Sequence, residues 1–176
     1  MVSVVKFLGY TLFFIASLLY FLPKAALYYA LEKELQNYKV IISHETAIDS
    51  GFALNVDDGT LSVSGIESAT FSHAKITPLI IYNELAIEDI KLSSAAKSFI
   101  PLQIASVALH YTLINPLEVA GSATGEFGEA SFSFDILERS MAVTLKPSER
   151  MNREFAHTLR NLKREQNGEY SYVKKI

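Results

Sequence analysis

The feature that most constrains this chain is the apolar stretch VSVVKFLGYTLFFIASLLYFLP at residues 2–23. Lys6 is its one charged residue, and no charge follows between Phe7 and Leu22. A helix of about 20 apolar residues spans the roughly 30 Å hydrocarbon core of a bilayer. The sequence therefore predicts that residues 2–22 form a membrane-spanning helix.

The ends of this stretch are typical of a membrane span. Lys6 can extend to the near interface, and Tyr10 and Tyr20 lie towards the two ends, where aromatic side chains favour the headgroup region. The side chains expected to contact the lipid are Phe7, Leu8, Leu12, Phe13, Phe14, Ile15, Leu18 and Leu19.

A cleaved signal peptide with MVSVVK as its n-region is the alternative. The apolar run is long for such a peptide, and the PKAALYYALEKELQNY that follows lacks a clear cleavage signal of small residues, so we favour an uncleaved anchor. Lys6 and the terminal amine favour a cytoplasmic N-terminus, although Lys24 and Lys33 beyond the span weaken this bias. This orientation places the body of a single-pass protein outside the cytoplasm.

Composition excludes several classes of protein. The chain is 49% apolar and 20% charged, which supports a packed body rather than a disordered one. It contains no cysteine, which excludes disulfides, thiolate nucleophiles and cysteine-ligated metals. The net charge of −3 argues against nucleic acid as a partner.

The periodicity of apolar residues changes at residue 38. Before it, Leu27, Leu31, Leu35 and Tyr38 recur at helical spacing and predict an amphipathic helix over residues 24–37. After it, apolar residues alternate with polar ones, as in ASFSFDI at 130–136. Eight or nine such segments, about ten residues apart, leave no room for helical crossovers and predict an antiparallel meander.

Local signals within the strands predict a turn and a bulge. Asp58-Gly59 lies between two alternating segments, a pattern typical of a hairpin turn. The alternation slips by one residue between Ile87 and Ile90, which indicates a β-bulge.

A second amphipathic helix is expected near the C-terminus. Pro147 ends the strands, Ser148 is a suitable N-cap, and the helix should extend over residues 148–165 before a short last strand. Its apolar stripe, a candidate interaction surface, consists of Met151, Phe155, Leu159 and Leu162.

The expected fold is mainly β with flanking helices: a transmembrane helix, then a curled antiparallel meander packed by the amphipathic C-terminal helix. The domain boundaries are a membrane anchor at residues 1–23, a connecting helix at 24–37 and a β-rich domain at 38–176.

No catalytic, metal or cofactor motif is present in the sequence. The four histidines, His44, His73, His110 and His157, have no metal-binding spacing, and the acidic pairs do not match a calcium loop. Nucleotide-binding and nucleophile-elbow motifs are also missing. We therefore expect a non-enzymatic protein without cofactor or metal.

Several short sequence motifs resemble those of a known group of proteins. They are DGTL at 58–61, IEDIKL at 87–92, TLKPS at 144–148 and NGEYSYV at 167–173. Together with the membrane helix, they resemble the AsmA-like and type II secretion N-component group of bacterial envelope proteins. The resemblance implies a protein anchored in the inner membrane with its C-terminal body in the periplasm, serving a secretion or pilus machine or handling envelope lipid.

Two functions follow from how the sheet is filled. If its apolar face closes on the helices, the protein is an accessory component that acts by binding envelope or secretion proteins. If the sheet curls into an open groove, the protein is a lipid-binding or lipid-transport module, and phospholipid is its partner. The residues expected to line that groove are Phe71, Val107, Leu109, Phe127, Phe132 and Phe134.

Overall fold

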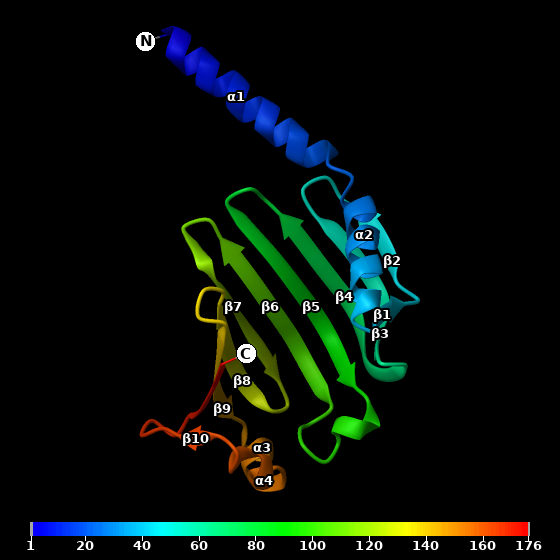
Figure 1. The fold of residues 1–176 in the computed structure, drawn as a ribbon, viewed down its shortest axis with the longest axis vertical. Coiled ribbons are helices and arrows are strands. Elements are labelled where there is room, and N and C mark those ends of the chain that lie inside the picture. Colours follow the sequence, from blue (N-terminus) through cyan, green and yellow to red (C-terminus); the bar gives the residue numbers. More distant parts are fainter. Residues whose placement is uncertain (1, 176) are drawn as a thin grey trace.

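The structure, a computed structural model, describes residues 2–175 and consists of two successive helices followed by a large sheet (Figure 1). Helix α1, Val2–Phe21, projects away from the sheet, and none of its apolar span is buried within the protein. It is long and apolar enough to cross a membrane. Helix α2, Lys24–Asn37, follows after two residues and lies against one side of the sheet.

The sheet has 11 strands and is an open antiparallel meander, which confirms the mainly β prediction. Each strand from β3 to β8 pairs with the next one in sequence, β11 pairs with β9, and β10 forms the far edge. Strands β1 and β2 both pair with β3 at successive positions. The strands are β1 Val40–Ser43, β2 Thr46–Asp49, β3 Leu54–Val63, β4 Ile66–Pro78, β5 Tyr82–Leu92, β6 Gln103–Thr112, β7 Asn115–Gly125, β8 Gly128–Asp135, β9 Ser140–Pro147, β10 Lys163–Arg164 and β11 Tyr170–Lys175.

The prediction of a hairpin turn at Asp58-Gly59 is wrong, because strand β3 continues through these two residues. Asp58 has a φ of 57°, but Gly59 pairs with Phe71 of β4, so the chain is locally irregular without reversing. The reversal occurs at Ser64-Gly65, where both residues have positive φ as a tight hairpin requires. The slip of alternation expected in β5 falls at Asp89, which has a φ of 52°. The registers of β5 with β4 and β6 stay constant across Asp89, so the predicted β-bulge, which would insert a residue, is not formed there.

The C-terminal helix expected over 148–165 is instead two short helices, α3 Glu149–Glu154 and α4 Ala156–Leu159, separated by Phe155. A 3-10 turn, η1 Ser94–Ala96, lies in the β5–β6 connection. Ser148 is the N-cap as expected: its Oγ accepts from the Met151 amide at 3.0 Å and donates to the Glu126 carbonyl at 2.6 Å.

Two separate apolar clusters form the core. One lies beneath α3 and α4 and consists of Phe127, Leu145, Met151, Phe155 and Leu159. The other lies between α2 and the first strands and consists of Tyr28, Leu54, Val56 and Ala74. Between them the sheet has no helix on its apolar side, which leaves a half-buried central region.

The residues that helix α2 buries most deeply are not those of its apolar stripe. Leu27 and Leu31 are exposed, whereas Lys24 and Tyr28, one turn apart, are buried. The Lys24 Nζ donates to the Leu22 carbonyl at 3.0 Å and lies 3.4 Å from Asp49 Oδ1. A buried ammonium is stable only with such partners, so these contacts orient the face of α2 that carries Lys24 towards β2.

Asp49 links this junction to the β2–β3 loop. Partial burial alone would raise the pKa of its carboxyl, but hydrogen bonds from the amides of Gly51 and Lys24, together with the Lys24 ammonium, lower that pKa below its ordinary value. The charged carboxylate therefore holds the start of α2 and the loop together at neutral pH.

Candidate functional site

A continuous apolar face extends across the sheet, because each strand places its apolar residues in register with those of its neighbours. Two rows of paired residues illustrate this pattern. The first row is Leu54, Ile76, Leu85, Leu109, Gly121, Phe132 and Val143, and the second is Val56, Ala74, Ile87, Val107, Ala123, Ala130 and Leu145.

Most of the residues expected to line a groove lie on this face. Val107 and Leu109 occupy the centre of the sheet, where they pair with Ile87 and Leu85 of β5. Phe132 and Phe134 follow two strands away, opposite Gly121 and Val119. Phe71 lies near α2 and covers Gly59, where any side chain would collide with its ring.

Phe127 and the expected helix stripe are placed elsewhere. Phe127 is buried in the cluster beneath α3 and α4. Met151, Phe155 and Leu159 pack in the same cluster, and Leu162 packs against it. These side chains close one end of the sheet instead of forming an exposed surface.

The apolar face contains a cavity of about 270 Å³ beneath α2. The helix contributes Tyr28, Leu31 and Leu35, and strands β3 to β5 contribute apolar side chains that include Val56, Phe71 and Ile87. Glu32 is the one charged residue in its lining. A dry cavity of about 150 Å³ holds a benzene ring, so this cavity has room for roughly ten carbon atoms.

Tyr28, one of the residues that line this cavity, carries an unsatisfied polar group. The residue is 9% exposed, and its hydroxyl has no hydrogen-bond partner among the described residues. Burial, followed by the nearby charges of Glu45 and Glu32, raises the pKa of this hydroxyl well above its usual range, so it stays neutral. A buried hydroxyl without a partner is unfavourable, and the surface that the cavity exposes is wholly apolar.

The opposite face of the sheet is polar and holds the side chains closest to a catalytic pattern. His73 Nδ1 contacts Asp57 across β3 and β4, and Glu88 is the register partner of His73 on β5. His157 bonds instead to the Ser98 carbonyl, far from this group. Within residues 2–175, no three potential ligand side chains gather as a metal site would require.

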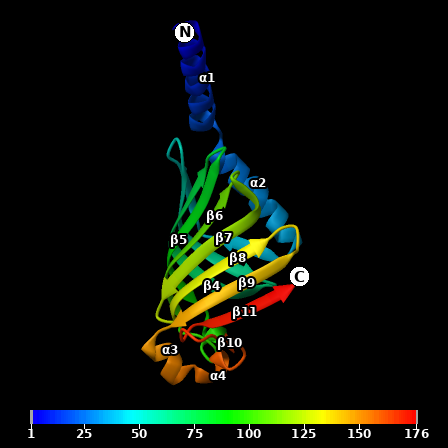
Figure 2. The same ribbon diagram turned by 90° about the vertical axis from the view of Figure 1, so that its left-hand side faces the viewer.

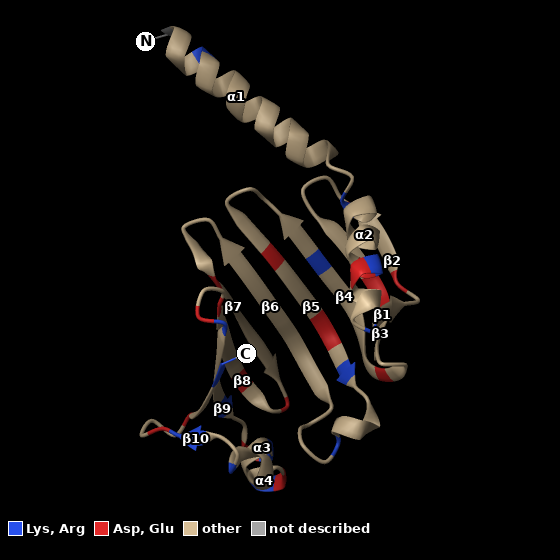
Figure 3. Ribbon diagram, in the orientation of Figure 1, with Lys and Arg blue, Asp and Glu red and all other residues tan. Residues whose placement is uncertain are grey.

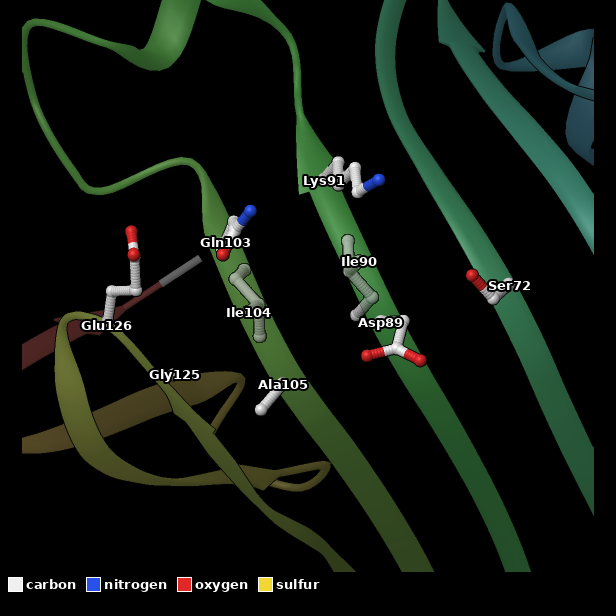
Figure 4. Close-up of a pocket in the computed structure, with 9 residues that line it drawn as sticks. All are labelled: Ser72, Asp89, Ile90, Lys91, Gln103, Ile104, Ala105, Gly125 and Glu126. Carbon is white, nitrogen blue, oxygen red and sulfur yellow. The ribbon is translucent and has the colours of Figure 1, made fainter.

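A wide hollow of about 640 Å³ lies over β4, β5 and β6 (Figure 4). Asp89, Lys91 and Gln103 border it, and Figure 4 shows these side chains spread along two strands rather than converging on one point. Such an arrangement brings no acid, base and nucleophile together.

Sequence reasoning did not find the cavity or Tyr28. Leu27, Leu31 and Leu35 dominate the periodicity of α2, and of these Leu31 and Leu35 line the cavity beside Tyr28. The spacing of Lys24 and Tyr28 by four residues is the one signal that places both on one face. Comparison of the chain with family models, curated proteins and solved structures gives no match.

Proposed function

We propose that this chain is a non-enzymatic lipid-binding module of the bacterial cell envelope, anchored in the inner membrane by α1 with its sheet in the periplasm. The acyl chain of a phospholipid lies along the apolar face of the sheet and enters the cavity beneath α2. The observation that carries this proposal is the cavity beneath α2, whose exposed lining is wholly apolar.

The chemistry of the cavity matches one end of a lipid. Its lining offers an apolar surface to the methylene groups of an acyl chain. A polar ligand would lose its hydration there without replacement.

The shape of the sheet extends this site. In Figure 2, β9 and β11 run obliquely to β5, and in this proposal the sheet curls around its apolar face as a trough. Helix α2 covers one side of the trough, and α3 and α4 close the end farthest from α1. Leu109, Phe132 and Val143 then continue the apolar path beyond the cavity.

Filling the cavity tests this proposal. Replacing Ala74 by phenylalanine adds a ring where the cavity lies, and we expect phospholipid that co-purifies with the full chain to fall at least about tenfold, the loss that 1.4 kcal/mol of binding energy produces. Mass spectrometry of the protein purified in detergent measures this lipid. Ala86→Phe is the matched control, because Ala86 pairs with Lys75 on the polar face. Equal lipid in Ala74→Phe and the wild type would contradict the proposal.

The hydroxyl of Tyr28 has a separate test. Tyr28→Phe removes an unsatisfied buried group, so we expect the free energy of unfolding to rise by about 1 kcal/mol. Because the exposed lining of the cavity contains no polar atom, the same change should leave lipid retention unchanged. Urea unfolding and lipid mass spectrometry measure the two effects, and a loss of stability in Tyr28→Phe would show that the hydroxyl has a partner.

The second candidate function is an accessory component of a type II secretion or related envelope machine that acts through protein interaction. The supporting observation is the edge of the sheet at β11: β10 pairs only with Tyr170 and Ser171, whereas residues 172–175 pair with β9 alone. An exposed edge can accept a strand from another protein. A pull-down from envelope membranes that recovers no component of such a machine would argue against this function.

A further inference from the structure

Three loops of the sheet carry exposed apolar side chains at their tips. The β4–β5 hairpin has Ile80 and Ile81, the β6–β7 hairpin has Leu113 and Ile114, and the β2–β3 loop has Phe52. Ile114 is 95% exposed and Ile81 is 68% exposed. Side chains of this kind rarely gather on the surface of a soluble protein without a partner.

The three loops lie at the same end of the sheet. In an antiparallel meander, alternate turns lie at the same end, and β4–β5 and β6–β7 are alternate turns. The Leu113 amide donates to the Ile81 carbonyl at 3.2 Å, so the two hairpins are neighbours. Figures 1 and 2 both place this end of the sheet next to the C-terminal end of α1.

The tips of these three loops are uncharged, although the β8–β9 turn at the same end of the sheet carries Glu138 and Arg139. Residues 50–53, 78–82 and 112–115 contain no charged side chain, and the loops nearest α1 are tan in Figure 3. At the opposite end, Arg150 forms ion pairs with Glu126 at 2.7 Å and with Glu154 at 3.1 Å. The three uncharged tips therefore favour an apolar environment, whereas the charged side chains at the opposite end favour water.

The apolar tips are held close to α1. The Tyr20 ring packs edge-on against Phe52 with centroids 5.4 Å apart, which joins the end of α1 to the β2–β3 loop. Two residues, Leu22 and Pro23, separate α1 from α2, and Lys24 is fixed to Asp49. If α1 crosses a bilayer, the tips cannot lie far from its surface.

We propose that these three loops form a second membrane contact, in which Phe52, Ile81 and Ile114 enter the boundary between headgroups and acyl chains of the leaflet where α1 ends. Apolar side chains at an interface are buried about 5–10 Å deep in that boundary. The contact places one end of the apolar sheet face against the bilayer. This inference rests on the membrane anchoring by α1 in the proposed function, and not on lipid binding in the cavity.

Tryptophan fluorescence tests the contact, because the chain contains no tryptophan and a single substitution gives a unique signal. The full chain carrying Ile114→Trp is reconstituted into vesicles of phosphatidylcholine and phosphatidylglycerol, with part of the phosphatidylcholine brominated near the carbonyl end of one acyl chain. Ile66→Trp is the matched control, because Ile66 is 65% exposed in the turn at the opposite end. Leu12→Trp, measured in vesicles brominated near the ends of the acyl chains because Leu12 lies at the middle of α1, reports the insertion of α1 independently.

We expect bromine to quench Ile114→Trp at least about half as strongly as Leu12→Trp, since the two sites then share the lipid phase, and to leave Ile66→Trp nearly unquenched. Quenching of Leu12→Trp alone would overturn the contact while leaving the anchor in place. A blue shift of Ile114→Trp without quenching would also overturn it, because the tips would then be covered by protein. Absence of quenching at Leu12→Trp would overturn both the anchor and the contact.

Discussion

A chain in which Leu12 and Ile15 are both replaced by arginine is expected to lose its hold on membranes. Each arginine at the centre of a membrane helix costs about 2.5–3.5 kcal/mol of insertion energy, so the pair costs about 5–7 kcal/mol. This loss of insertion energy is larger than the loss of folding free energy expected from any single substitution in the sheet. The sheet should remain folded, because none of the apolar span of α1 is buried against it.

The measurement is flotation of the purified variant with vesicles after an alkaline wash, and urea unfolding monitors the sheet in parallel. The control carries the same two charges at Ser3→Arg and Val4→Arg, near the end of α1, where arginine reaches the interface. We expect the control to float with the vesicles and the central variant to remain at the bottom. Flotation of both variants would show that α1 is not the anchor.

Leu54→Ala is expected to give the largest loss of folding stability among single changes in the sheet. Leu54 is 1% exposed and packs with Tyr28, Val56 and Ala74 under α2. Truncating a leucine at such a site costs about 3 kcal/mol, which combines lost burial with the cavity that remains. Because α2 and β3 share this cluster, we expect the connecting helix to separate from the sheet at lower urea concentrations.

The control for this prediction is Ile48→Ala on the neighbouring strand β2. Ile48 is 53% exposed, so its truncation should change the free energy of unfolding by about 0.5 kcal/mol or less. Urea titration of both full-length variants in detergent gives the two values, provided that the slope of the transition remains constant. Equal losses would mean that the cluster beneath α2 does not stabilise the fold.

Part of the fold could be predicted because it depends on local patterns. The apolar run predicts α1, and the alternation in segments such as ASFSFDI predicts the strands. The short spacing of these segments predicts an antiparallel meander, since neither helices nor long crossovers fit between them. Several groove candidates also lie on one face, because alternation with period two determines the face of a strand.

Other features depend on packing between distant segments, which local patterns do not encode. Asp58-Gly59 has the composition of a turn, but β3 stays extended through it because it pairs with β4 along one edge and with β2 before and β1 after these residues along the other. The stripe from Met151 to Leu162 predicts one helix, yet the chain breaks at Phe155 so that this ring enters the cluster with Phe127. In both cases, tertiary contacts outweigh local propensity.

By itself, the sequence determined which segments are helical or extended and which strand positions are apolar, because these properties follow from the period of the residues along the chain. Only the tertiary structure decided that Lys24 and Tyr28 face the sheet, that a cavity remains beneath α2, and that three uncharged loops lie beside the end of α1. The physical reason is that burial, cavity volume and neighbouring loops are set by how elements far apart in sequence pack together, and one hydroxyl without a partner becomes visible only in that packing.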